Sequence, residues 1–177
     1  MKVIFLDIDG VLNNDAHWKT IAKKKKPYTQ VSQKLLNKLL LIIEATGAKL
    51  VISSSWRGYQ LNYTIEDFET CKSKNELKQI TKYIVGITPH SQERHRGKEI
   101  KWFIENQDDC LYYKLVDQKL DIEDYVIIDD DSDMLDEQKS HFFQTKYWRG
   151  LTMWEVKKII NYLTDKELWK SKSNMNL

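Results

Sequence analysis

Acidic side chains stand at the ends of two apolar runs in this sequence. Asp7 directly follows residues 2–6, and Asp9 lies two positions further on. Asp129 and Asp130 follow a second apolar run, YVII. Carboxylates that share a crevice repel one another unless a cation lies between them. If the two runs are neighbouring strands, the sequence therefore predicts a site for a hard divalent cation such as Mg²⁺.

Hydroxyl side chains end a third apolar run. Ser53, Ser54 and Ser55 follow residues 49–52, which have the composition of a buried strand. Ligands of open parallel sheets bind in the crevice outside the carboxyl ends of the strands. The serines and the aspartates are therefore expected to converge on one crevice.

The elements that must position these side chains alternate between strand-like and helix-like patterns. The predicted strands are residues 2–6, 49–52, 83–87, 125–128 and 142–145. The predicted helices are residues 32–45, a segment that begins near Lys98, and residues 152–163, where Thr152 and Glu155 form a capping box. Residues 13–29 are expected to form a lysine-rich loop, and residues 59–83 one or two further helices. This alternation predicts an α/β fold with three layers and a mostly parallel, Rossmann-like sheet.

Length and composition limit the classes of protein. The 177 residues suit one domain, which we expect to span residues 1–165 and to be followed by a polar tail at 166–177. A hydrophobic content of 41% can form a core, and a net charge of +2 does not by itself indicate a nucleic-acid-binding protein. Two distant cysteines and the lack of an apolar run of membrane length favour a cytoplasmic protein without a disulfide scaffold.

The ordered motifs resemble those of the haloacid dehalogenase-like (HAD) superfamily. FLDIDGVLN is similar to its first motif, LVISSS to its second, RGKEI to its third and VIIDDD to its fourth, over residues 3 to about 133. Within that superfamily, FLDIDGVLN, SSSWR and the FFQT…GLT segment resemble the small HAD domains of RNA-repair ("Swiss Army Knife") proteins. The resemblance implies a phosphatase.

Residue roles follow from the resemblance. It implies that Asp7 is a nucleophile that forms an aspartyl-phosphate, and that Asp9 transfers protons to the leaving group and from water. It implies that Lys98 neutralises charge on the transferring group. One serine would bind a phosphoryl oxygen; Ser54 is favoured, and the register leaves Ser53 and Ser55 open.

The resemblance also implies the ligands of Mg²⁺. Asp7, the backbone carbonyl of Asp9 and Asp130 would hold the ion, and Asp129 could join them. At least one aspartate of residues 129–131 could instead cap the following helix.

Several basic residues have two possible interpretations. Arg57 could bind a substrate phosphate, or it could lie on the surface and stack on Trp56. The lysines of residues 23–26 could contact a polyanion, but a solvated loop is favoured. Residues 94–96 (RHR) could widen a basic entrance to the site.

The leading hypothesis is a phosphatase with little or no cap domain, because the segments between the motifs are short. An open crevice favours a nucleotide or polynucleotide substrate, such as a phosphorylated RNA or DNA end. The alternatives are a phosphatase of mononucleotides or sugar phosphates, and a non-catalytic nucleic-acid-binding module. The intact set of Asp7, Asp9 and Lys98 argues against the non-catalytic module.

Overall fold

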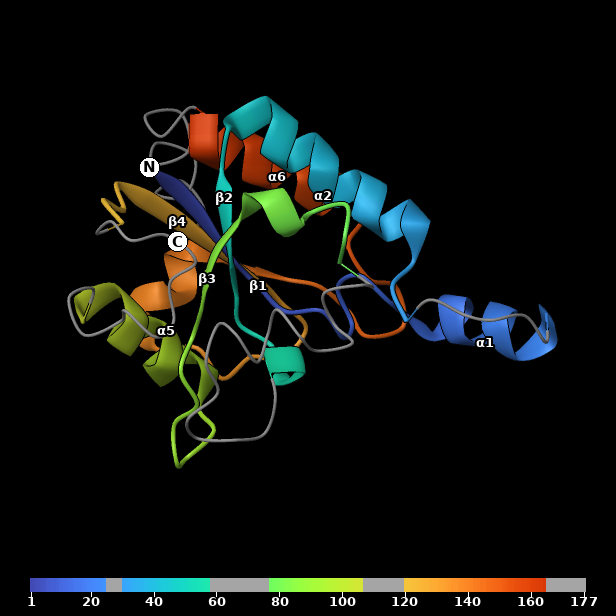
Figure 1. Cartoon of the computed structure of the whole chain (residues 1–177), viewed down its shortest axis with the longest axis horizontal. Helices are drawn as coiled ribbons and strands as arrows, with labels where there is room; N and C mark the ends of the chain where they lie inside the picture. Colours follow the sequence, from blue (N-terminus) through green and yellow to red (C-terminus); the bar gives the residue numbers. More distant parts are fainter. Residues whose placement is uncertain (25–29, 58–76, 107–119, 165–177) are drawn as a thin grey trace, which may run out of the picture.

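The protein is built around a five-stranded parallel sheet with the strand order β3-β2-β1-β4-β5 (Figure 1). The structure is a computed structural model that describes residues 1–24, 30–57, 77–106 and 120–164. The strands are β1 (Lys2–Leu6), β2 (Lys49–Ile52), β3 (Ile84–Ile87), β4 (Asp124–Asp129) and β5 (Phe142–Gln144). The predicted strands are thus present close to their expected ends, and the predicted α/β class is confirmed.

The central strand β1 ends level with its two neighbours. Leu6 pairs with Ile52 of β2 on one side and with Ile128 of β4 on the other. The ladders continue for one more step, because Asp7 N–H donates to Ile128 O at 2.9 Å and Ser53 N–H donates to Leu6 O at 2.8 Å. The residues that follow the three strands therefore lie side by side at one edge of the sheet.

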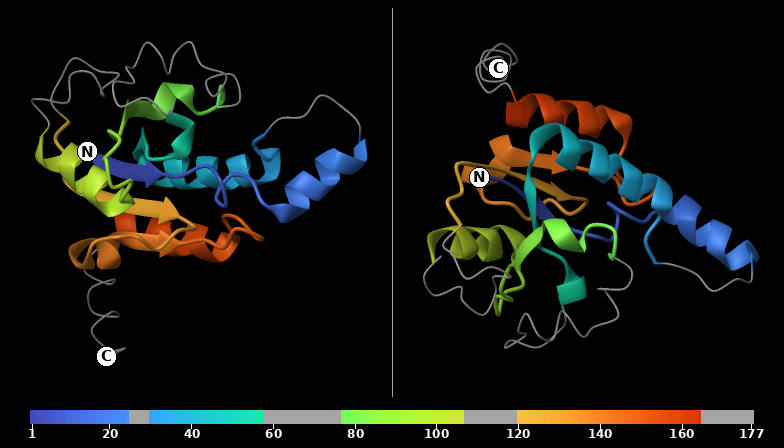
Figure 2. Two further views of the ribbon diagram at one scale, coloured as in Figure 1. Left: turned by 90° about the horizontal axis from the view of Figure 1, so that it is seen from below. Right: turned by 45° about the horizontal axis from the view of Figure 1, so that its top comes forward.

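Helices cover both faces of the sheet, which gives three layers (Figure 2). The helices α2 (Gln33–Thr46) and α6 (Met153–Thr164) pack together on one face, against Ile4 and Leu6 of β1. The helix α5 (Arg96–Glu105) covers the other face, where Phe103 meets Phe5 edge to face. Alternate residues of β1 thus serve opposite layers, as expected for a strand buried on both sides.

One predicted loop is a helix. Residues 13–29 were expected to be irregular, but α1 (Asp15–Lys24) occupies much of this segment and projects from the sheet (Figures 1 and 2). The side chain of Asn14 caps it, since His17 N–H donates to Asn14 Oδ1 at 2.8 Å. Most residues of α1 are polar, and none of residues 15–23 belongs to the buried core. The sequence therefore lacks the broad apolar face from which a packed helix is predicted.

The short 3₁₀ helices are η1 (Ser55–Arg57), η2 (Thr81–Tyr83) and η4 (Asp136–His141). The capping box predicted for α6 is present, with Thr152 N–H donating to Glu155 Oε2 at 3.0 Å and Trp154 N–H to Thr152 Oγ1 at 3.2 Å. The polar tail predicted at 166–177, and most of the region 59–83, lie outside the described residues. Among the described helices, none has the length and apolar character needed to cross a membrane.

Candidate active site

Three carboxylates gather at the carboxyl edge of the sheet. Asp7 follows β1, whereas Asp129 ends β4 and Asp130 follows it, and one oxygen of each lies within 4.8 Å of the others. Asp7 and Asp129 are only 6% and 2% exposed. The structure thus brings together three of the four aspartates that the sequence nominated as metal ligands. An all-oxygen set of this size suits Mg²⁺, which prefers carboxylates and water.

The electrostatics of the cluster also fit a cation. Burial, and then the charge of Asp129, raise the pKa of Asp7 well above its usual value, against the lowering effect of Arg96. Burial raises the pKa of Asp129 to about 7, and burial together with Asp131 raises that of Asp130. A divalent ion among these groups would favour their charged forms.

Gly10 allows Asp130 to approach the loop after β1. The backbone of Gly10 has φ +68°, and a Cβ atom there would lie 2.3 Å from Cγ of Asp130. Thr145 fixes this loop by donating from Oγ1 to Gly10 O at 2.8 Å. Only glycine therefore combines this conformation with the position of Asp130.

Asp9 is held by two donors at the rim of the cluster. Its Oδ1 accepts from Asn13 Nδ2 at 2.7 Å, and its Oδ2 accepts from Trp56 Nε1 at 3.0 Å. Asn13 is fully buried and also accepts from Gly10 N–H at 2.9 Å. Trp56 was considered as a surface on which Arg57 could stack, but its indole N–H holds Asp9 in this orientation.

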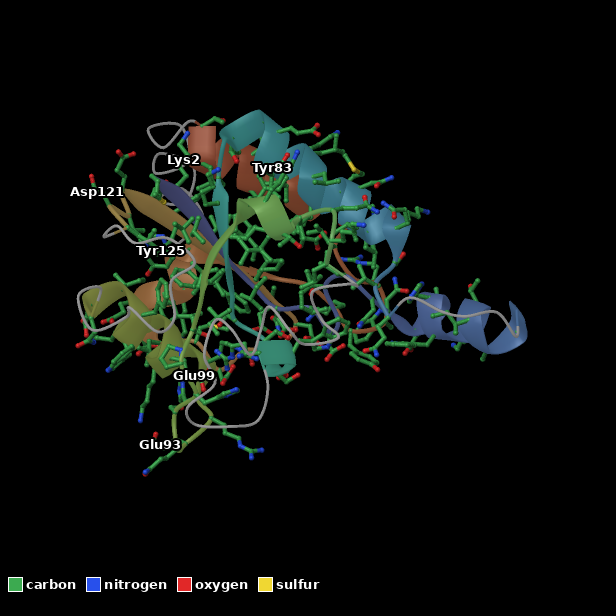
Figure 3. All side chains as sticks on the ribbon, in the orientation of Figure 1. Lys2, Tyr83, Glu93, Glu99, Asp121 and Tyr125 are labelled. Atoms are coloured by element: carbon green, nitrogen blue, oxygen red, sulfur yellow. The ribbon has the colours of Figure 1, made fainter. Side chains whose placement is uncertain are left out.

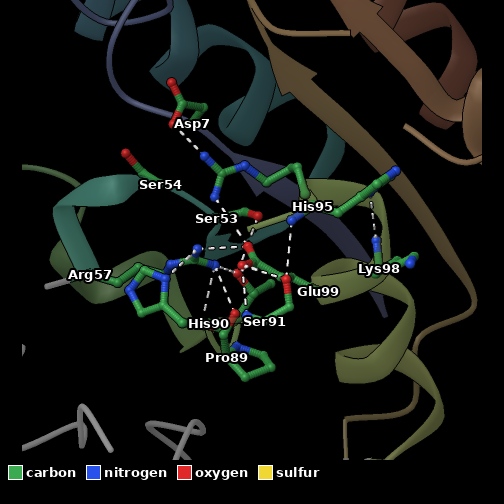
Figure 4. A network of polar contacts seen from close by, with 12 residues as sticks. Asp7, Ser53, Ser54, Arg57, Pro89, His90, Ser91, His95, Lys98 and Glu99 are labelled. Atoms are coloured by element: carbon green, nitrogen blue, oxygen red, sulfur yellow. Dashed lines mark hydrogen bonds and ion pairs between the residues drawn. The ribbon is translucent and has the colours of Figure 1, made fainter. Parts of the chain in front are cut away.

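The basic residue beside the carboxylates is Arg96, not Lys98. Arg96 Nη2 lies 3.5 Å from Asp7 Oδ1, and its Nε lies 3.2 Å from Asp129 Oδ2. Lys98 is half exposed, and its Nζ pairs with Glu93, which lies at the periphery of the molecule in Figure 3. Figure 4 shows Lys98 well apart from Asp7. The structure therefore does not place Lys98 where it could neutralise charge on the transferring group, the role expected for it, and Arg96 occupies that position. The first turn of α5 points residue 96 inward and residue 98 toward solvent.

The three serines have different environments. Ser54 is fully buried, and a hydrogen bond from its hydroxyl helps to hold down the pKa of Asp7. Ser53 accepts from Thr88 Oγ1 at 3.2 Å, while Ser55 is exposed at the start of η1. Of the three, Ser54 is the serine that faces the nucleophile.

Arg57 is neither stacked on the surface nor free to bind substrate with its whole side chain. It is 2% exposed, and its Nη2 lies 2.7 Å from Oε2 of Glu99, which is equally buried. Its Nη1 donates to Thr88 O at 3.2 Å, and burial lowers its pKa to about 10. Glu99 also lies 3.5 Å from Arg96, so this buried pair supports the arginine at the carboxylates.

The start of α5 is fastened to the loop that follows β4. Arg96 N–H donates to Asp133 Oδ2 at 2.8 Å, and Gln138 Nε2 donates to Gly97 O at 2.8 Å. Gln138 is buried, and its Oε1 lies 2.6 Å from the position of a Cβ atom on Gly97. No motif in the sequence predicted this connection between Asp133, Gln138 and the start of α5.

A cavity of about 420 Å³ opens beside this network. Arg57, Arg96 and Glu99 contribute to its wall from the buried side. The rest of the lining is polar and consists of Ser55, His90, Ser91, Gln92 and Arg94. Residues 94–96 were expected to widen a basic entrance, but of the three only Arg94 and Arg96 line the cavity. His95 instead caps α5 by accepting from Lys98 N–H at 3.4 Å.

A parallel sheet whose central strand ends in Asp-x-Asp, between one neighbour that ends in serines and another that ends in aspartates, defines a protein of the HAD class. The chain belongs to the family of HAD domains in Swiss Army Knife RNA repair proteins, whose family model matches residues 3–156. No curated protein and no solved structure matches it significantly.

Proposed function

We propose that the protein is a Mg²⁺-dependent phosphohydrolase that acts through an aspartyl-phosphate on Asp7. The observation that carries the proposal is the meeting of Asp7, Asp129 and Asp130 within 4.8 Å, with Arg96 against two of them. Asp7, Asp130, the Asp9 carbonyl and Asp129 would hold Mg²⁺. The ion would neutralise charge on the phosphoryl oxygens and on the carboxylates.

The reaction has two displacements. A carboxylate oxygen of Asp7 forms a bond to phosphorus as the ester P–O bond breaks, and Asp9 gives its proton to the leaving oxygen. Asp9 then accepts a proton from water, whose oxygen attacks phosphorus and releases phosphate and the free Asp7 carboxylate. The hydrogen bonds from Asn13 and Trp56 orient Asp9 for both transfers.

Arg96 and Ser54 position the transferring group. The guanidinium of Arg96 would stabilise negative charge on the phosphoryl oxygens as it develops, since it is fixed before substrate binds. Ser54 would donate to a phosphoryl oxygen from the end of β2. Both side chains already contact Asp7.

The substrate that we propose is a nucleotide or a polynucleotide with a phosphorylated end. Membership of an RNA-repair family supports this class, as does the polar cavity beside Arg96. We also propose that residues 1–165 form the catalytic unit. A phosphatase of sugar phosphates remains the second candidate, because the same carboxylates would serve it.

The test is phosphate release in the presence of Mg²⁺ by the wild-type protein and by Asp7→Asn. A 3′-phosphorylated oligonucleotide should be hydrolysed faster than sugar phosphates, and Asp7→Asn should be inactive on both. Preference for the sugar phosphates would exclude the polynucleotide. If Asp7→Asn and the wild type release phosphate at the same rate, the result would support the alternative of a non-catalytic domain.

A further inference from the structure

Arg94 is an exposed basic residue that lines the cavity. Among the described residues, no hydrogen bond or ion pair reaches its side chain, whereas Arg57 and Arg96, which line the same cavity, are both paired with buried carboxylates. Its backbone has φ +51°, an unfavourable conformation for a residue with a Cβ atom. Residues in such conformations tend to cluster at active sites and ligand-binding sites.

The conformation of Arg94 is fixed by a turn. Arg94 N–H donates to Ser91 O at 3.0 Å, and Ser91 N–H in turn donates to Oε1 of buried Glu99 at 2.9 Å. The turn is thereby connected to the Arg57–Glu99 pair. The backbone that carries the Arg94 guanidinium is thus anchored to the interior.

The cavity is adjacent to the nucleophile. Arg96 lines the cavity and lies 3.5 Å from Asp7, and Ser55, on the same wall, directly follows Ser54. A group in the cavity and a phosphate at Asp7 would therefore lie on either side of Arg96. A volume of about 420 Å³ exceeds what one phosphate needs and falls in the range of pockets for small ligands.

We propose that this cavity is a second anion subsite, in which Arg94 binds a phosphate of the substrate other than the one transferred to Asp7. The inference rests on the proposed function and narrows it to substrates that carry at least two phosphate groups. A nucleoside bisphosphate and an oligonucleotide with a terminal phosphate share this chemistry. The planar guanidinium can donate two parallel hydrogen bonds to such a group.

The experiment compares kcat/KM for adenosine 3′-monophosphate, adenosine 5′-monophosphate, adenosine 3′,5′-bisphosphate and a 3′-phosphorylated dinucleotide. The wild type should prefer a substrate with two phosphate groups over either monophosphate by about tenfold or more, as for one charge-assisted hydrogen bond. Arg94→Ala should bring that ratio close to one, chiefly through KM, and Arg94→Lys should restore part of it. Lys101→Ala, an exposed lysine of α5 that pairs with Glu137, is the matched control and should keep the ratio.

The outcomes separate the two proposals. Preference for the bisphosphate alone identifies a free nucleotide, and preference for the dinucleotide alone identifies a chain end; either supports the subsite. Equal kcat/KM for all substrates, or a preference that survives in Arg94→Ala, would overturn the subsite and leave the phosphatase intact. Release from none of them would overturn the phosphatase and the subsite together.

Discussion

Arg96 Nη2 lies 3.5 Å from Asp7 Oδ1, while the lysine two positions further along the same helix points to solvent. Residues two apart on a helix do not share a face, so only one of them can reach the carboxylates. The contact with Asp129 at 3.2 Å places the guanidinium between the ends of β1 and β4. The charge balance of the site therefore depends on Arg96.

Replacing Arg96 should abolish most activity. We expect Arg96→Ala to lower kcat by about 100-fold or more, as for the loss of a fixed donor to a developing anion. Lys98→Ala should retain kcat within about twofold, since the Nζ of Lys98 pairs with the exposed Glu93 and not with the carboxylates of the site. Steady-state phosphate release measures both, and loss of activity in Lys98→Ala alone would contradict the geometry.

Trp56→Phe should impair proton transfer by Asp9. The variant removes the indole N–H that donates to Asp9 Oδ2 at 3.0 Å and keeps an aromatic ring. We expect kcat to fall several-fold more for an alkyl phosphate than for p-nitrophenyl phosphate, whose leaving group needs little protonation. The exposed Trp148, changed to Phe, is the control. An equal fall for both esters would mean that Trp56 is only a packing residue.

Gly10→Ala should disrupt the carboxylate cluster. The added methyl group would lie 2.3 Å from Asp130 Cγ, at a φ of +68° that costs about 1–2 kcal/mol for a residue with a Cβ atom. We expect a weaker affinity for Mg²⁺ and a lower melting temperature, measured by calorimetry. Gly47→Ala has the same φ and open space around it, so it should lose stability but keep the affinity for Mg²⁺.

The metal-free protein should lose stability as the pH rises. The pKa of Asp129 is raised to about 7 and that of Asp7 is also raised, above unfolded values near 4. Groups with raised folded pKa values contribute their full stability below about pH 4 and lose it as the pH rises through about 7. Thermal unfolding in chelator across this range should show this component of stability declining. It should be weaker in Asp129→Asn.

Mg²⁺ should oppose this loss. The ion binds the charged carboxylates, so the increase in melting temperature that it causes should grow from pH 5 to pH 8. An increase that is independent of pH would show that the ion does not bind at these aspartates.

Breaking the buried pair should destabilise the fold. Arg57→Ala removes the 2.7 Å ion pair of Glu99, which is 2% exposed, and leaves it the longer 3.5 Å contact to Arg96 and the hydrogen bond from Ser91 N–H. We expect a loss of about 3–5 kcal/mol in the free energy of unfolding, measured with urea. Lys101→Ala, on the surface of the same helix, should change it by less than about 0.5 kcal/mol. A small effect of Arg57→Ala would mean that water reaches Glu99.

The strand ends were predictable because each short apolar run is followed directly by the polar residues of the candidate site. Asp7, Ser54 and Asp130 could be placed at one edge from alternation alone, since parallel strands present their carboxyl ends together. Apolar periodicity likewise located α2 and α6, which bury a broad face.

Other features depend on contacts that no local pattern contains. To choose Arg96 over Lys98, one must know which residues of the first turn of α5 face the carboxylates. The sequence located the start of this helix only approximately, near Lys98. Trp56 donates to Asp9 from a distant segment of the chain, and Asn13 donates from the loop that follows Asp9. The buried Arg57 pairs with Glu99 of α5, which is 42 residues away in the sequence. The helix α1 was missed because most of its residues are polar and its lysines were read as part of a solvated loop.

The hydrogen bond from Gln138 Nε2 to Gly97 O connects two segments that are distant in the chain. The start of α5, which carries Arg96, and the segment after the acidic end of β4 are therefore held together by side-chain and backbone hydrogen bonds. A mutation at Gln138, which lines neither the carboxylate cluster nor the cavity, would remove one of these bonds and leave those from Arg96 and Gly97 to Asp133. A search for reactive side chains would pass over this glutamine, although it holds the backbone next to Arg96.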